Sequence, residues 1–205
     1  MPADKRNVTD KFILLFTGHL LDAANRTDSR FTHDMLEDAR TLISIYIDKA
    51  LLTKNISCAV CSLAAGGDML FADEILKRKI PLTVFIPFEK ERFISTSVNY
   101  LKGMPDENPE EWRNEFERLL LLVTDLKYLD HTETTGQAYS DCNKEILEYA
   151  LAQREENVLA LALMRHDEEA AVGGTAHFVN EIRKQNIPVD IVWVDDDGED
   201  RKSVV

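Results

Sequence analysis

Two glycine pairs have the spacing of an anion-binding site, because each stands between a strand-like run and a helix-like run. Gly66 and Gly67 separate an apolar run from an amphipathic stretch. Gly173 and Gly174 do the same later in the chain. A strand that turns through glycine into a helix exposes unpaired backbone N–H groups at the positive end of the helix dipole. Two such turns in one domain predict a single phosphate-bearing ligand held from two sides.

The same glycines also have a purely structural interpretation, which the sequence leaves open. Glycine tolerates a positive φ and has no Cβ, so it is common wherever a strand bends tightly into a helix. Neither turn matches the G-x-G-x-x-G dinucleotide fingerprint or the G-x-x-x-x-G-K-[S/T] phosphate loop. The predicted ligand site therefore rests on the pairing of the two turns and on the residues around them.

Polar residues follow the first apolar run, where the predicted first strand ends. Thr17, Gly18 and His19 offer a hydroxyl, a flexible backbone and an imidazole, and Arg30 follows in a long polar loop. A guanidinium in such a loop can bind phosphate with two parallel hydrogen bonds. The alternatives are a buried, backbone-satisfied histidine at position 19 and a solvated charge at position 30. Thr175, directly after the second glycine pair, adds a second hydroxyl to the predicted binding set.

Two further side chains have the spacing of a ligand wall. Tyr139 and Asn143 are four residues apart, so they share one face of a predicted helix. This pair could stack on a base and hydrogen-bond to it, although ordinary packing with a surface amide explains the pair equally well. Asp68 opens the helix after the first glycine pair, where a carboxylate either caps the helix or bonds a ribose hydroxyl.

Three carboxylates are candidates for catalysis if the ligand is cleaved, namely Asp22, Asp68 and Glu181. His177, in the first turn after the second glycine pair, would form an acid–base pair with His19 if both reached the ligand. No serine or cysteine lies in a nucleophile-elbow motif, and the histidines and carboxylates do not cluster at metal-ligand spacing. We therefore predict no metal site.

The composition limits the partners. The chain has 205 residues, is 44% hydrophobic and carries a formal net charge of −13, so it lacks the basic charge of a general nucleic-acid binder. A small phosphorylated ligand is still compatible, since local backbone amides and a few arginines outweigh the global field. No apolar run has the length of a membrane span, and residues 1–10 are polar, which predicts no signal peptide and no membrane partner.

The cysteine pattern favours a structural role. Cys58 and Cys61 form a C-x-x-C in a predicted strand, where residues three apart point to opposite faces. No second C-x-x-C completes a zinc site, so we expect both to be buried core residues without metal or disulfide. Reduced thiols and the missing export signal predict a cytoplasmic protein.

Apolar runs alternate with helical periodicity along the whole chain. Strands are predicted at 12–16, 57–63, 82–87, 125–129, 158–164 and 189–194. Helices are predicted at 34–52, 68–79, 89–98, 111–122, 140–153 and 175–185. This alternation predicts an α/β fold, a Rossmann-like doubly wound and mainly parallel sheet with helices on both faces. We expect one domain over 11–194, an N-terminal tail over 1–10 and an acidic C-terminal tail over 195–205.

The chain resembles the SLOG superfamily, the Rossmann-like group that includes the LOG phosphoribohydrolases, the DNA-processing protein DprA and nucleotide-sensor domains. The segment 63–68 with Ala72 is similar to that group's glycine turn and alanine-rich helix, and the segments 173–181 and 187–189 are similar to its late glycine–threonine turn, helix and final strand. Residues 16–31 with Pro87, Phe88 and Phe93 are similar to Rossmann-like domains found beside nucleotide cyclases or helical repeats. The resemblance covers most of the chain between residues 12 and 194.

One position departs from the LOG pattern. LOG enzymes carry a glutamate three residues after the glycine–threonine turn, whereas this chain has Phe178 there and its nearest glutamate, Glu181, three residues later. The resemblance thus implies a nucleotide pocket more strongly than LOG-type hydrolysis.

The sequence predicts a protein that binds a nucleotide or nucleotide-derived small molecule, as a sensor or signalling module. The first alternative is an N-glycosidase that acts on such a ligand. The second is a protein-interaction scaffold with a relic pocket, and a homo-oligomer or a signalling partner protein stays open.

Overall fold

A computed structural model describes residues 10–23, 26–101, 108–153, 156–166 and 169–194 of the chain. Within these residues, six strands form one sheet in the order β4-β3-β2-β1-β5-β6, and every neighbouring pair is parallel. The strands are β1 (Lys11–Gly18), β2 (Asn55–Cys61), β3 (Leu82–Ile86), β4 (Asp125–Tyr128), β5 (Glu156–Met164) and β6 (Val189–Trp193). The predicted parallel α/β sheet is confirmed.

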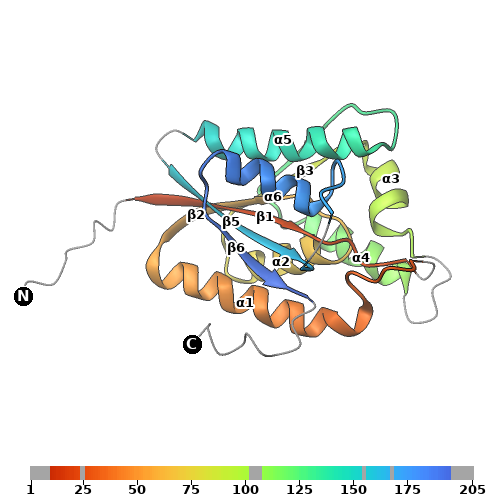
Figure 1. The fold of residues 1–205 in the computed structure, drawn as a ribbon, viewed down its shortest axis with the longest axis horizontal. Helices are drawn as coiled ribbons and strands as arrows, with labels where there is room; N and C mark the ends of the chain where they lie inside the picture. Colours follow the sequence, from red (N-terminus) through yellow and green to blue (C-terminus); the bar gives the residue numbers. More distant parts are fainter. Residues whose placement is uncertain (1–9, 24–25, 102–107, 154–155, 167–168, 195–205) are drawn as a thin grey trace, which may run out of the picture.

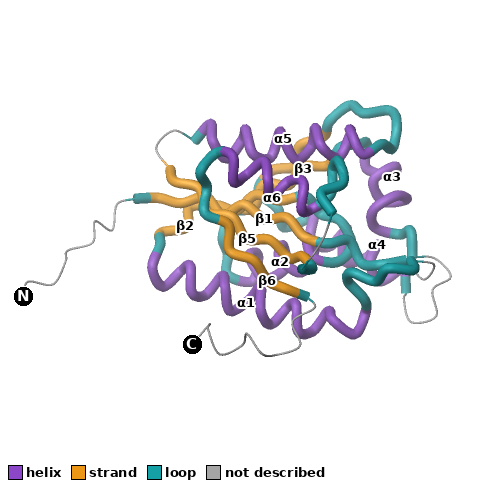
Figure 2. The backbone as a smooth tube through the Cα atoms, in the orientation of Figure 1, coloured by secondary structure: helices purple, strands orange, loops and turns teal. Residues whose placement is uncertain are grey.

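Helices cover both faces of the sheet (Figure 1). On one face lie α1 (Leu36–Thr53), α2 (Gly67–Lys77) and α4 (Pro109–Leu120), and on the other lie α5 (Gly136–Ala152) and α6 (Thr175–Lys184). Short segments complete the helices: the 3₁₀ turn η1 (His33–Met35), α3 (Lys90–Phe93) and the π-helical turn η2 (Ile94–Val98). Figure 2 shows the resulting layers, with orange strands between two sets of purple helices.

The side chains of β1 show why its sequence is a continuous apolar run. Ile13 and Leu15 pack in the cluster beneath α5 and α6, whereas Leu14 and Phe16 belong to the larger core beneath α1 and α2. Phe16 stacks on Phe71 of α2 with ring centroids 4.4 Å apart. Each such buried side chain stabilises the fold by roughly 1.5–3 kcal/mol. A strand covered on both faces therefore needs apolar residues at every position.

The C-x-x-C residues lie on opposite faces, as their spacing predicts. Cys61 is fully buried in the core beneath α1 and α2, and Cys58 packs against the cluster beneath α5 and α6. The expectation that both are buried is wrong for Cys58, which is only half-buried because the first half of β2 is less covered than its end. Cys58, Cys61 and Cys142 form no disulfide.

Two helix boundaries differ from the prediction for local reasons. The stretch 89–98 is not one helix, because its hydrogen bonding widens from α3 into the π-turn η2. Helix α5 begins four residues before the predicted start, because the Thr135 side chain caps it by accepting a hydrogen bond from the Ala138 N–H at 3.2 Å. Apart from Asp10, the predicted tails lie outside the described residues, as does 102–107.

The connection through α5 creates a switch in strand order. From β1 the chain moves outward through β2 and β3 to β4, then returns over the other face and adds β5 on the opposite side of β1. The loops after β1 and β5 therefore diverge, and such a switch point is where ligands bind in open parallel sheets. Among the described residues, no helix has both the length and the apolarity to cross a membrane.

An ion network joins the three helices of the larger face. Asp73 and Glu74 of α2 are almost fully buried, and Arg40 of α1 reaches both carboxylates, at 2.6 Å and 3.4 Å. Arg118 of α4 contacts Asp73 at 2.5 Å, and Lys77 contacts Glu74 at 2.8 Å. Burial alone would raise the pKa of Glu74, but hydrogen bonds from Lys77 and Arg78 lower it to about 2.

We predict that Glu74→Gln lowers the free energy of unfolding at pH 7 by about 1–3 kcal/mol. A carboxyl with a lowered pKa stabilises the fold above its unfolded-state pKa, so the difference between wild type and variant should shrink as pH falls from about 4.5 to about 2. Urea unfolding of both proteins across this pH range measures the difference in stability. Glu148→Gln, which removes an exposed partner of Lys144, should change stability by less than about 0.5 kcal/mol. Equal effects of both variants would contradict this account.

Candidate functional site

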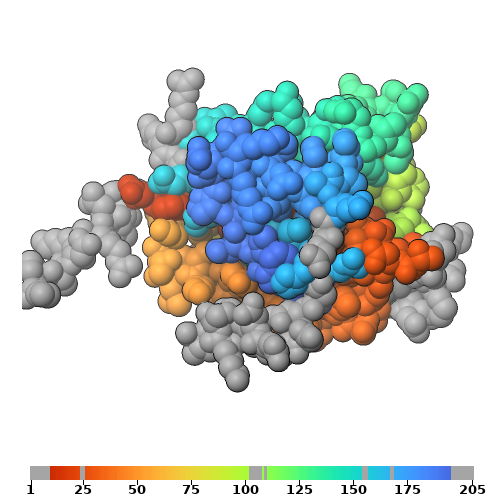
Figure 3. Space-filling model, in the orientation of Figure 1, coloured from red at the N-terminus to blue at the C-terminus, as the bar shows by residue number. Residues whose placement is uncertain are grey.

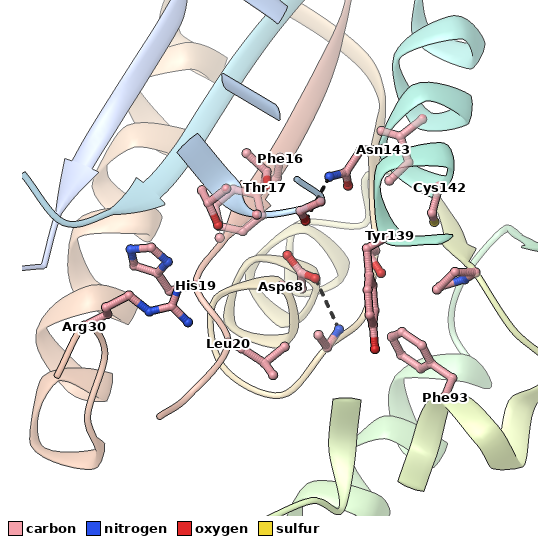
Figure 4. A pocket seen from close by; sticks show the side chains of 18 residues that line it. Phe16, Thr17, His19, Leu20, Arg30, Asp68, Phe93, Tyr139, Cys142 and Asn143 are labelled. Atoms are coloured by element: carbon pink, nitrogen blue, oxygen red, sulfur yellow. Dashed lines mark hydrogen bonds between the residues drawn. The ribbon is translucent and has the colours of Figure 1, made fainter. Parts of the chain in front are cut away.

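A pocket of about 140 Å³ opens at the carboxyl ends of the strands, next to the switch point between β1 and β5 (Figure 4). Its walls come from the end of β1, the turns after β2 and β3, α5 and the start of α6. Most of the predicted binding residues line it: Thr17, Gly18, His19, Arg30, Asp68, Tyr139, Asn143, Gly173, Gly174 and Thr175. Segments far apart in sequence thus form one site.

The first glycine turn serves packing and does not line the pocket, contrary to the prediction for Gly66 and Gly67. The Gly67 N–H donates to the His19 carbonyl at 3.0 Å, so it is not available to a ligand. Gly66 has φ +109°, and a Cβ there would lie 2.7 Å from the Leu21 nitrogen. These glycines let the turn pass directly under the end of β1.

The second glycine turn faces the pocket. Gly173 and Gly174 line it, and Gly174 is the N-cap of α6 without a capping side-chain hydrogen bond. Gly173 has φ +83°, and a Cβ there would lie 2.4 Å from the Gly136 carbonyl oxygen at the start of α5. The Asn143 side chain donates to the Gly173 carbonyl at 3.4 Å. The positive end of α6 is thus held beside α5 at the pocket wall.

His19 is hydrogen-bonded to the backbone, which is the alternative to ligand binding for this residue, and it also lines the pocket. Its Nε2 accepts a hydrogen bond from the Arg165 N–H at 3.0 Å, so in this arrangement the proton lies on Nδ1. His177 is not among the pocket-lining residues. The structure therefore does not bring the two histidines together as an acid–base pair in the pocket.

One face of α5 forms the wall opposite His19. Tyr139, Cys142, Asn143 and Ile146 all line the pocket. Their spacing of three, four and seven residues is that of one helical face, a signal from which the two unpredicted members could have been found. The Tyr139 hydroxyl shares a hydrogen bond with the Ser97 hydroxyl at 3.0 Å, a contact that nothing in the sequence indicates.

Asp68 lies at the centre of the pocket, between His19 and Arg30 on one side and Tyr139 on the other (Figure 4). Its side chain accepts a hydrogen bond from the Ala64 N–H at 3.2 Å. Burial raises its pKa to about 7, even though backbone hydrogen bonds from Ala64 and Gly18 oppose the shift. Asp68 does not cap α2, because the N–H groups that donate to it belong to Ala64 and Gly18, outside that helix; of its two predicted roles, only a place in the pocket is compatible with these contacts.

The two thiols near Asp68 are poor nucleophiles. Burial, with the negative charge of Asp68 as a second cause, raises the pKa of Cys142 and of Cys61. A thiol with a raised pKa carries little thiolate at neutral pH. Among the described residues, no group of three or more histidine, cysteine or acidic side chains is arranged to hold a metal ion.

The other two candidate carboxylates are not in the pocket. Asp22 accepts hydrogen bonds from the N–H groups of Arg30 and Phe31 and so closes the loop after β1. Glu181 forms an ion pair with Lys184 at 2.6 Å and is partly exposed on α6. Neither carboxylate is therefore placed to act on a ligand in this pocket: Asp22 accepts hydrogen bonds within its own loop, and Glu181 lies outside the pocket on α6.

The loop that carries Arg30 is tied to the segment after β5. Arg165 donates to Asp28 and to the Ser29 carbonyl, both at 2.7 Å. In Figure 3, orange surface from the early part of the chain lies beside light-blue surface from the later part. Arg30 itself forms an ion pair with Asp22 at 3.7 Å and still lines the pocket. The ion pair with Asp22 helps to hold the Arg30 side chain at the pocket wall.

The chain matches no protein-family model, and a search of curated proteins found no match. The resemblance to the SLOG superfamily therefore stays a prediction.

We predict that Gly66→Ala destabilises the protein by more than about 2 kcal/mol, because the residue has φ +109° and its Cβ would meet backbone atoms. Gly174→Ala is the matched control, since φ −82° suits any residue and the nearest atom to its Cβ is the Ala171 oxygen at 3.1 Å. Gly174→Ala should lower the free energy of unfolding by at most about 1 kcal/mol. Thermal unfolding compares the two. A Gly66→Ala protein as stable as wild type would show that the first turn is not a packing contact.

Proposed function

We propose that this protein binds a nucleotide or a nucleotide-derived small molecule in the pocket, and that it does so as a sensor or signalling module. One observation carries the proposal. The start of α6, which has no side-chain cap, lines the same pocket as the aromatic and amide side chains of α5. An anion suits the first feature and a base or ribose suits the second.

The phosphate end of the ligand would lie at the start of α6. The first N–H groups of a helix have no partner within the helix and lie at its positive end. The Thr175 side chain lines the pocket here, and the Arg30 guanidinium lines it at the mouth. Charge-assisted hydrogen bonds of this kind each contribute roughly 1.5–3 kcal/mol.

The base end would lie against an apolar wall. Pro87, Phe93 and Tyr139 line that part of the pocket, and Tyr139 is held edge-on to Phe88 with ring centroids 5.4 Å apart. The hydrogen bond between the Ser97 and Tyr139 hydroxyls fixes the Tyr139 ring further. Asn143 would supply an amide to the ribose or the base. A preorganised aromatic wall of this kind lowers the ordering cost of binding.

The volume favours a small ligand. The pocket holds about 140 Å³, which is less than the ~300–1,000 Å³ typical of sites that enclose a whole drug-sized ligand. A mononucleotide would therefore be enclosed in part, with its remaining atoms at the solvent.

Slow cleavage of an N-glycosidic bond is the second candidate, and Asp68 favours it. A buried carboxyl with a pKa near 7 can act as a general acid or base at neutral pH. Against rapid turnover, the LOG-type glutamate position is Phe178, which is buried in the core, and Glu181 is outside the pocket. These features favour a binding module over an efficient hydrolase.

We predict that calorimetry of the full chain with nucleoside mono-, di- and cyclic phosphates gives heat with at least one of them. Asn143→Ala should weaken that binding about tenfold, which corresponds to ~1.4 kcal/mol, because the variant removes an amide from the pocket wall. Asn180→Ala, an exposed position on α6, is the matched control and should leave the affinity unchanged.

Two outcomes would change the assignment. Base release detected by chromatography and lost in Asp68→Asn would favour the N-glycosidase. No heat with any probe would leave the scaffold alternative.

A further inference from the structure

Asp68 is the one carboxylate among the described residues that line the pocket. It is 8% exposed, and it accepts a hydrogen bond from the backbone N–H of Ala64. A buried carboxylate normally pairs with a cation, since burial without a charged partner disfavours the ionised form. Here backbone N–H groups are the contacts that oppose the effect of burial.

The groups around Asp68 come from every neighbouring element. His19 faces it from the end of β1, and the thiols of Cys61 and Cys142 lie on β2 and α5. Tyr139 stands on α5, and Arg30 stands at the mouth with Asp22 as its ion-pair partner. Pro87 after β3 and Phe93 of α3 add only apolar lining, and α6 adds Thr175.

A phosphorylated ligand in this pocket would meet Asp68 at short range. A phosphomonoester carries roughly −1.5 to −2 charges at neutral pH. Two anions inside one small pocket repel each other, and this repulsion is relieved when one of them takes up a proton. The carboxyl is the group that does so, because its burial already disfavours the ionised form.

We propose that Asp68 is protonated in the ligand complex and donates a hydrogen bond to a ligand oxygen, so that binding takes up one proton from solvent. This inference rests on the proposed function. A protonated Asp68 would determine specificity, since the ligand must place a hydrogen-bond acceptor within reach of that carboxyl. A ligand with only apolar atoms there would leave a buried donor unpaired and lose affinity.

The test is calorimetry with adenosine 5′-monophosphate, guanosine 5′-monophosphate, cyclic adenosine monophosphate and ribose 5-phosphate between pH 7 and pH 9. In this range the phosphate groups of these probes are almost fully ionised. Buffers with different ionisation enthalpies give the number of protons taken up. We expect a value approaching one at pH 8 and above, and an affinity that falls up to about tenfold per pH unit.

Two variants make the test specific. Asp68→Asn keeps a hydrogen-bond donor without a charge, so it should bind at pH 9 more tightly than wild type does and show no pH dependence. Glu181→Gln, outside the pocket, should keep the wild-type pH profile. The buffer measurement on wild type needs no variant and stands even if Asp68→Asn folds poorly.

The outcomes separate the two proposals. Binding without proton uptake, or a wild-type pH profile in a folded Asp68→Asn protein, overturns the role of Asp68 and leaves the binding function intact. Weaker binding by Asp68→Asn at every pH also overturns it, because an ionised carboxylate would then be required. If no probe binds at any pH, the proposed function fails and this inference falls with it.

Discussion

The backbone at the end of β1 touches the backbone at the start of α2, with no room for a side chain between them. A Cβ on Gly18 would lie 3.1 Å from the Gly67 Cα, and a Cβ on Gly67 would lie 3.0 Å from the Gly18 Cα. Hydrogen bonds on either side fix this contact, from Gly67 to the His19 carbonyl and from Leu21 to the Ala65 carbonyl. Because α2 begins directly under the strand, its second residue, Asp68, is held inside the edge of the sheet. The raised pKa and the central position of this carboxyl both follow from that contact.

The two glycine turns therefore have opposite uses. At the first turn, the Gly67 N–H donates to a backbone carbonyl, and the helix that follows carries the Asp68 carboxyl in its first turn. This turn therefore offers little to an anionic ligand. The second has no capping side chain and borders the pocket. The start of α2 carries the Asp68 carboxyl, whereas the start of α6 has no capping side chain. An anionic ligand in the pocket would therefore be attracted by the start of α6 and repelled by an ionised Asp68. Proton uptake by the carboxyl would relieve this conflict.

The parallel sheet and most of the residues that line the pocket could be predicted from the sequence. The apolar runs of β1, β3 and β5 are continuous because helices cover both faces, and this pattern predicts parallel strands. Pocket residues at or after strand ends, such as Thr17 at the end of β1 and Gly173 after β5, then follow from the rule that the carboxyl ends of parallel strands meet at one edge. The different uses of Gly66 and Gly174 could not be predicted, since a packing glycine and a ligand-binding glycine look the same in sequence. The Ser97–Tyr139 contact could not be predicted either, because it depends on the π-turn η2.

The central claim is that a phosphate binds at the start of α6 and not at the first glycine turn. The most direct measurement is a ¹H–¹⁵N spectrum of the full chain titrated with adenosine 5′-monophosphate. The account predicts that the amides of Thr175 and Ala176 show the largest downfield shifts, because they would donate to the phosphate, while the Gly67 amide keeps its hydrogen bond to His19 and changes little. The largest shift at Gly67, or no shift at Thr175 and Ala176 in a saturated complex, would contradict it.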